Sequence, residues 1–267
     1  KAKPGLKTAA IDRNVPVPPA PFLGYRHVVD IDTGAVLELV NRQALFRGRW
    51  GYRRGKMSAA DYEALIATEV SPIYDDLCGR SRAGGLVQPR AAYGYFRSWS
   101  EGDRVCVADG DTVLNFDFPR QEDPPHLCIA DYFRSAENGG DIAGFFVVSI
   151  GPRIAEETAR LFAADRYHDY LMMHGFSVEV TDALAEYWHA VMRRELGVDD
   201  GEPGSLQGYV TQGYRGARYG FGYPACPDLD AHQEVFQLLR PDGIGVTLTE
   251  SMQMVPEQTT SAIVVHH

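Results

Sequence analysis

A change of hydrophobic period near residue 150 constrains the fold of this chain more than any other sequence feature. Before that point, short runs rich in β-branched and aromatic residues are broken by Gly, Asp and Pro. Glu-Gly-Asp at 101–103 and Asp-Gly-Asp at 109–111 are turn sequences, which indicate that successive runs are antiparallel neighbours. The almost unbroken apolar run Ile142–Ile150 predicts a central strand. We therefore expect strands over residues 91–97, 103–108, 112–116, 127–130 and 142–150.

Beyond residue 150 the pattern is helical. Residues 153–196 are the longest stretch in which apolar side chains recur with a helical period. Nearer the N-terminus, Asp32 or Thr33 is expected to cap a helix whose apolar face reaches Leu45, and Ser58 to cap a second helix. These elements predict an α+β fold, a single domain with a twisted, mainly antiparallel sheet surrounded by helices.

The N-terminal segment differs in composition from the rest of the chain. Residues 1–21 are expected to form a Pro-rich interdomain linker and residues 22–267 the folded domain, because Val-Pro-Val-Pro-Pro-Ala-Pro at 15–21 favours an extended polyproline conformation. A linker without an initiator Met indicates a piece of a longer protein. No apolar run approaches the ~18 residues that span a membrane, and no signal peptide is recognisable. We expect a cytoplasmic location and no membrane partner.

The net charge of −10, from 26 basic and 36 acidic side chains, argues against nucleic-acid binding, which requires a concentrated basic surface. The basic side chains that do cluster lie around Trp50 and Tyr52. One interpretation is a solvated hairpin or turn. The other is a docking surface for an acidic protein partner, which opposite charge would steer into place. The residues of this basic cluster are Arg47, Arg49, Arg53, Arg54 and Lys56.

The cysteines and histidines do not have the spacing of a metal site. The four cysteines are far apart and include no Cys-x-x-Cys pair, which argues against a structural zinc site and a dense disulfide framework. Cys106 and Cys128 are expected to be buried thiols, and Cys226 is expected to have a packing role. His168 and His174 are too far apart in sequence to share one turn of a helical face, so we expect them to cap or pack. No metal site is therefore predicted. The cysteines are Cys78, Cys106, Cys128 and Cys226.

Residues 214–228 carry the strongest indication of a ligand site. The segment brings together the guanidinium of Arg218, free backbone amides and the phenol of Tyr223, which suits a ligand with a carboxylate and a flat ring. It is expected to be neither a regular helix nor a central strand. A Gly/Pro-rich surface loop is the alternative from composition alone. The residues that break regular structure, by permitting positive φ or by fixing φ, are Gly216, Gly220, Gly222, Pro224 and Pro227.

Four ordered segments point to one family. Residues 218–228 read Arg-Tyr-Gly-Phe-Gly-Tyr-Pro-Ala-Cys-Pro-Asp, and the others read Ala-Leu-Phe-Arg-Gly-Arg-Trp-Gly-Tyr at 44–52, Leu-Cys-Ile-Ala-Asp-Tyr-Phe at 127–133 and Ile-Gly-Val-Thr-Leu-Thr-Glu-Ser at 244–251. Together they resemble the activation domain of cobalamin-dependent methionine synthase, whose signature is Arg-Pro-Ala-Pro-Gly-Tyr-Pro-Ala-Cys-Pro. The resemblance runs from about Pro21 to His267.

This resemblance implies that the chain binds S-adenosylmethionine and presents the methyl group for reductive methylation of cob(II)alamin on a neighbouring domain of the same polypeptide. A flavodoxin-like or other electron donor would be a second partner. The chain would then be part of a methyltransferase of methionine biosynthesis, without being catalytically complete itself. It has no Asp-x-His-x-x-Gly motif to ligate cobalt and no cysteine set for the homocysteine-activating zinc. Neither cobalamin nor zinc is expected in this fragment. The alternative is a free-standing S-adenosylmethionine-binding reactivator of another corrinoid protein.

The family's ligand residues map onto the segment after residue 217. Arg218 corresponds to the family arginine that pairs with the ligand's carboxylate. Gly220 corresponds to a position that contacts the ligand through its backbone, an alanine in the family, so the difference is expected to matter little. Tyr223 corresponds to the tyrosine beside it. Val264 and Val265 fall where the family places further ligand contacts on the last strand, predicted here over 262–266.

One position departs from the family pattern. The family's helix aspartate corresponds to Asn41, which forms hydrogen bonds but lacks the charge that favours the ligand's ammonium or sulfonium. Asp182 or Glu250 is expected to supply that charge. The ligand residues predicted through the resemblance are therefore Arg218, Gly220, Tyr223, Asn41, Asp182, Val264 and Val265.

Overall fold

The computed structural model describes residue 11 and residues 15–199, 201, 203 and 205–267. The predicted linker therefore lies largely outside the described residues, and residues 15–20 adopt neither helix nor strand. None of the helices in the described ranges is both long enough and apolar enough to cross a membrane.

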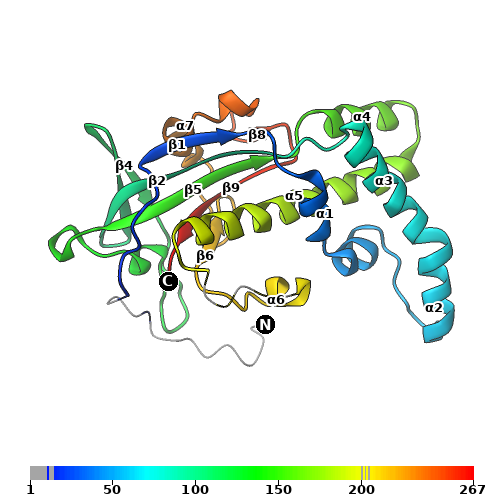
Figure 1. The fold of residues 1–267 in the computed structure, drawn as a ribbon, viewed down its shortest axis with the longest axis horizontal. Coiled ribbons are helices and arrows are strands. Elements are labelled where there is room, and N and C mark those ends of the chain that lie inside the picture. Colours follow the sequence, from blue (N-terminus) through cyan, green and yellow to red (C-terminus); the bar gives the residue numbers. More distant parts are fainter. Residues whose placement is uncertain (1–10, 12–14, 200, 202, 204) are drawn as a thin grey trace.

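The centre of the fold is a seven-stranded sheet in which every pair of neighbours is antiparallel. The strand order is β4-β3-β2-β5-β9-β6, and β1 pairs with the first half of β2 while β3 pairs with its end. This confirms the predicted fold class, including the central strand after residue 140 (Figure 1). The strands are β1 Gly24–Val28, β2 Arg90–Glu101, β3 Arg104–Asp109, β4 Thr112–Asp117, β5 Asp141–Ser149, β6 Ala217–Gly220 and β9 Thr259–Val265. A separate ribbon pairs β7 Thr247–Leu248 with β8 Met254–Val255.

The strand predicted over residues 127–130 is wrong. Residues Ile129–Tyr132 form a 3₁₀ turn, η3, because the Asp131 carboxylate accepts a hydrogen bond from the Cys128 amide at 3.0 Å while the Asp131 amide donates to the Cys128 carbonyl. This reciprocal capping gives the local backbone an alternative to a strand ladder.

The helices begin largely where the sequence predicts. Asp32 and Ser58 cap α1 and α2 through their side chains. The 153–196 stretch is two helices, since Asp165 adopts a φ of 57° between them. The predicted face ending at Leu45 is also divided, between α1 and a π-helix, η1. The helices are α1 Thr33–Glu38, η1 Ala44–Arg49, α2 Ala59–Leu65, η2 Ile66–Val70, α3 Ser71–Gly84, η4 Ala136–Asn138, α4 Arg153–Ala163, α5 Tyr167–Glu195, α6 Leu206–Val210, α7 His232–Leu239 and η5 Pro241–Ile244.

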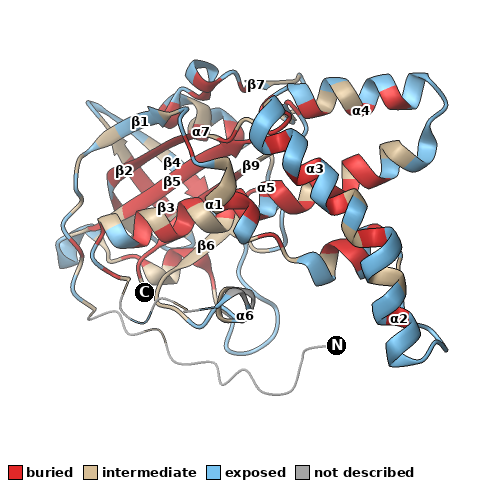
Figure 2. Cartoon of the chain, turned by 45° about the vertical axis from the view of Figure 1, so that its right-hand side comes forward, coloured by how far each residue is buried: buried red, intermediate tan, exposed pale blue. Residues whose placement is uncertain are grey.

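The sheet is buried on both faces, which explains the unbroken apolar run of β5. Phe146 and Val148 pack in a core with α1, α3 and α5, whereas Phe145 and Val147 point to the other side, in a core with α7. Figure 2 shows the buried positions concentrated in the central strands and in α5, while α2 extends away from the sheet and is mostly exposed.

Helix α5 is the element that connects the sheet to the remaining helices. The hydroxyls of Tyr93 and Tyr95 on β2 donate to the Glu195 carboxylate at 3.0 and 2.9 Å. At the other end of α5, the Trp50 indole donates to the Met172 carbonyl at 2.8 Å and lies so close to Gly175 that a Cβ there would be 2.9 Å from the ring. The motif at 44–52 therefore packs η1 directly on α5.

Candidate ligand site

The segment at 214–228 forms the edge of the sheet. Strand β6 pairs with β9, with Arg218 opposite Val264 and Gly220 opposite Ala262. A tight turn follows, in which the Cys226 amide donates to the Tyr223 carbonyl at 2.8 Å and Gly222 adopts a φ of 87°. The prediction that this segment is neither helix nor central strand is confirmed, because β6 is a short edge strand.

Two adjoining cavities lie between this edge and α5. The first, of about 430 Å³, is lined by Arg218, Gly220 and Tyr223 together with Asp182 of α5 and Thr260–Ala262 of β9. The second, of about 340 Å³, is lined by residues that include His232, Glu257 and Phe221. Asp182, Tyr223 and Thr260 line both, so the two cavities lie side by side. We call the first the site cavity.

Opposite charges meet in the site cavity. The Arg218 guanidinium forms an ion pair with Glu186 of α5, with Nη1 and Oε2 2.5 Å apart, and keeps 25% of its side-chain surface exposed. Asp182, one turn earlier on α5, has no such close partner, since its nearest ion pair is with Arg49 Nη2 at 4.0 Å. The site cavity therefore offers a paired guanidinium and a carboxylate whose own counter-ion is distant.

Three acids occupy one face of α5 at helical spacing: Glu179, Asp182 and Glu186. Glu179 is buried and accepts from Arg49 Nε at 2.9 Å. Desolvation raises the pKa of Asp182, a rise opposed by the charges of Arg49 and Arg218. Desolvation likewise raises the pKa of Glu179, and the hydrogen bond from Arg49 opposes it.

Sequence reasoning missed Glu179, Glu186 and His232. The sequence shows the helical spacing of the acids along α5. Nothing in the sequence indicates that the face of α5 carrying these acids lies next to β6. His232 is buried, with Nδ1 2.8 Å from the Met252 carbonyl and Nε2 2.9 Å from the Ser261 hydroxyl. Because a carbonyl only accepts, Nδ1 carries the proton and Nε2 accepts from Ser261. Desolvation lowers the pKa of His232, consistent with a neutral ring.

The structure brings some of the predicted ligand residues together and places others elsewhere. Arg218, Gly220, Tyr223 and Asp182 line the site cavity. Val264 and Val265 are buried in the two cores, and the earlier residues Thr260–Ala262 of the same strand line the cavity instead. The Asn41 side chain accepts a hydrogen bond from the Ala44 amide at 3.1 Å, at the start of η1. Glu250 is an exposed turn residue between β7 and β8.

The basic cluster is divided in its roles. Arg49 pairs with Glu179, and Arg47 donates to the Tyr62 hydroxyl at 3.2 Å. Arg53, Arg54 and Lys56 are exposed in the turn between η1 and α2. All four cysteines are buried free thiols, which confirms the prediction made for Cys106 and Cys128.

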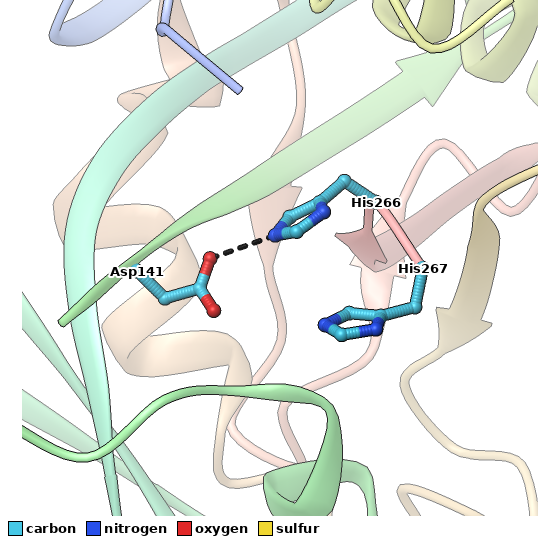
Figure 3. A group of neighbouring side chains, drawn as sticks. All are labelled: Asp141, His266 and His267. Carbon is cyan, nitrogen blue, oxygen red and sulfur yellow. Dashed lines mark hydrogen bonds and ion pairs between the residues drawn. The ribbon is translucent and has the colours of Figure 1, made fainter. Parts of the chain in front are cut away.

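One group of side chains in the described part of the chain has the composition of a metal site: Asp141, His266 and His267 (Figure 3). Its geometry is that of a structural hydrogen-bond cluster. The Asp141 carboxylate accepts from His266 Nε2 at 2.9 Å, the Ile142 amide at 2.7 Å and the Arg134 amide at 3.1 Å. The centres of the two imidazoles are 4.7 Å apart in a stacked pair, and one ring nitrogen of His266 is already bonded to Asp141. We assign this cluster to fastening β5, β9 and the loop after η3.

The fold and the site define a class, an α+β domain with a mixed-charge ligand cavity at the edge of an antiparallel sheet. A family model, described as vitamin B12 dependent methionine synthase, activation domain, matches residues 49–267. The chain belongs to this family, which confirms the resemblance seen in the sequence.

The relatives and a solved structure agree. The chain is 41% identical over 283 residues to the methionine synthase of Mycobacterium tuberculosis (strain ATCC 25618 / H37Rv), covering 99% of this chain, and 39% identical over 274 residues to that of Mycobacterium leprae (strain TN), covering 95%. It spans only 24% and 23% of those proteins. A crystal structure described as the MetH reactivation domain bound to AdoHcy superposes with a TM-score of 0.83 at 23% identity, over 97% of this chain and 83% of that one, and shares the fold.

Proposed function

We propose that this chain binds S-adenosylmethionine in the site cavity and presents its methyl group to cob(II)alamin held by a neighbouring domain of the same polypeptide. The observation that carries the proposal is that Arg218 and Asp182 line one cavity. S-adenosylmethionine has a carboxylate, an ammonium and a sulfonium, so each of its charges can meet an opposite one. The family description and the AdoHcy bound by the structural neighbour support this class of ligand.

Four residues of the site cavity have distinct roles in this proposal. Arg218 binds the carboxylate, Asp182 attracts the cationic groups, the backbone at Gly220 contacts the ligand and the Tyr223 ring covers it. The chain's contribution to the reaction is then positioning, since it orients the methyl group and keeps water away from it. The assignment of Asn41, Val264 and Val265 as ligand contacts rests on the family resemblance alone.

The remaining partners follow from the length of the relatives. Because this chain spans about a quarter of the two methionine synthases, we propose that cobalamin is carried by another part of such a polypeptide and that this fragment holds neither cobalamin nor zinc. Cobalamin would supply the cobalt centre that accepts the methyl group, an electron donor would supply the one electron that methylation of cob(II)alamin requires, and S-adenosylhomocysteine would leave. The exposed basic residues Arg53, Arg54 and Lys56 suit the docking of an acidic electron donor of the flavodoxin kind, in the cytoplasm. One tightly bound equivalent of zinc or cobalamin in the purified chain would contradict the proposal that this fragment holds neither.

Replacement of Arg218 tests the proposed role directly. Arg218→Ala should weaken S-adenosylmethionine binding by roughly ten- to a hundred-fold, because a carboxylate–guanidinium hydrogen bond contributes about 1.5–3 kcal/mol. Arg104→Ala is the matched control, since Arg104 forms an exposed ion pair with Asp117 at 2.7 Å and does not line the site cavity. Isothermal titration calorimetry on both variants, with circular dichroism to verify folding, gives the answer. Equal affinities in the two folded variants would remove Arg218 from the site.

A further inference from the structure

The backbone alone does not fix the guanidinium of Arg218. Arg218 lies on a four-residue edge strand that is followed directly by a turn containing Gly222. Its side chain is long and has several rotatable bonds, so holding it in one orientation costs conformational entropy. An arginine that binds a carboxylate through paired N–H groups must present one plane of its fork to the ligand. Something other than β6 must set that plane.

Glu186 is placed to do so. It lies two-thirds of the way along the 29-residue helix α5, and only 14% of its side-chain surface is exposed. Its Oε2 contacts Arg218 Nη1, while its Oε1 is buried without a hydrogen-bond partner and lies 3.9 Å from Arg193 Nη1. Glu186 is absent from the lining of the site cavity, whereas Arg218 is part of it. The Glu186 carboxylate thus contacts Arg218 from outside the lining of the site cavity.

The surroundings of Glu186 are buried and closely packed. The Arg193 guanidinium is fully buried, contacts His189 Nδ1 at 2.8 Å and stacks 3.7 Å from the centre of the Tyr214 ring. Burial and the charges of Arg218 and Arg193 lower the pKa of His189 well below its usual value, so this ring stays neutral. Burial, with the negative charge of Glu186, raises the pKa of Tyr214 to about 12. A carboxylate held in such a buried cluster can fix the orientation of a long side chain that the edge strand alone does not set.

We infer that Glu186 is a positioning residue, which commits Nη1 of Arg218 and so directs the remaining N–H groups of the guanidinium into the site cavity for the carboxylate of the ligand. The inference rests on the proposed function and adds a residue that does not touch the ligand. The opposing possibility is that Glu186 competes with the ligand for Arg218. The two possibilities predict opposite changes in ligand affinity when Glu186 is replaced. Loss of a competitor would tighten binding, whereas loss of a positioning residue would weaken it.

The test compares two ligands that differ only in the carboxylate: S-adenosylmethionine and decarboxylated S-adenosylmethionine. Glu186→Gln, which keeps the size of the side chain, should weaken S-adenosylmethionine binding by roughly tenfold and change binding of the decarboxylated ligand by less than about twofold. In the Arg218→Ala background the same substitution should have no further effect, since coupled residues are non-additive. Glu179→Gln is the matched control on the same helix face, because Glu179 pairs with Arg49 and not with Arg218.

A merely structural role would weaken both ligands equally, and competition would tighten S-adenosylmethionine; either result overturns the inference. If Glu186→Gln does not fold, Glu186→Asp keeps the charge with a shorter reach, and its loss should again be confined to the ligand with a carboxylate. Failure of the proposed function looks different, since the wild-type chain would then bind neither ligand.

Discussion

At the scale of single residues, the site depends on the close approach of Gly220 and Tyr223. A Cβ at residue 220 would lie 2.8 Å from Cδ2 of the Tyr223 ring and 3.2 Å from its Cε2. The structure therefore gives the glycine a packing role as well as a backbone role. From the sequence we expect the difference between alanine and glycine at residue 220 to matter little. That expectation leaves out the contact between a Cβ at residue 220 and the Tyr223 ring.

Gly220→Ala should weaken S-adenosylmethionine binding several-fold and leave the melting temperature nearly unchanged. The added methyl group must displace the Tyr223 ring, which can swing outward because it is 61% exposed. Calorimetry and thermal melts measure the two effects. Gly79→Ala serves as the control, as its Cβ would meet nothing within 4 Å. Unchanged affinity in Gly220→Ala would mean that the Tyr223 ring does not contact the ligand.

Asp141→Ala should lower the free energy of unfolding by about 3 kcal/mol or more and leave ligand stoichiometry intact. The substitution leaves three donors without their acceptor, the buried imidazole of His266 and the partly buried amides of Ile142 and Arg134, and each buried donor left unsatisfied costs about 1–3 kcal/mol. Chemical denaturation measures the loss. If zinc raised the melting temperature of the wild type strongly and that of Asp141→Ala not at all, the cluster would be a metal site instead of a structural one.

At the scale of elements, α5 carries the charges of the site. Arg49 balances Glu179 and Arg218 balances Glu186, which leaves Asp182 as the carboxylate between the two cavities with the most distant partner. Glu257 lines the second cavity as well. The acidic side chains that line the two described cavities, Asp182 and Glu257, therefore favour a ligand that carries positive charge.

Asp182→Asn should weaken S-adenosylmethionine by roughly tenfold, because a charged hydrogen-bond partner contributes more than a neutral one. The loss should be smaller for S-adenosylhomocysteine, which keeps the ammonium but not the sulfonium. Asp117→Asn, on exposed strand β4, is the matched control. Calorimetry with both ligands measures the ratio. Equal losses would place only the ammonium near Asp182, and no loss would assign the cation to another acid.

The pH dependence of binding follows from the raised pKa of Asp182. The carboxylate attracts a cation only when it is ionised, so affinity should fall as the pH drops through a pKa that lies above the ordinary Asp value. In Asp182→Asn this step should be absent. Titrations from about pH 7 down to about pH 4 with wild type and variant measure it. A step of the same size and position in both proteins would assign the titration elsewhere.

At the scale of the whole molecule, the sequence was sufficient for most of the sheet, apart from residues 127–130 and β6, but not for the way the site is assembled. Short runs of β-branched and aromatic residues and the acidic turns between them predict an antiparallel sheet, because strand propensity and turn chemistry are local properties. Contacts between distant segments leave no such local pattern. Arg49 and Glu179 are 130 residues apart, and Arg218 and Glu186 are 32 apart, so only the folded packing of η1 and β6 on α5 reveals those pairs. Family resemblance supplied Arg218, Gly220 and Tyr223, whose motif is local.

The central claim is that this domain is by itself a binding site for S-adenosylmethionine. Calorimetric titration of the wild-type chain with S-adenosylmethionine, in the absence of cobalamin, tests it most directly. Saturable binding of one ligand per chain is expected. A correctly folded chain that gives no saturable heat with S-adenosylmethionine, and no shift in melting temperature at high ligand concentration, would contradict it.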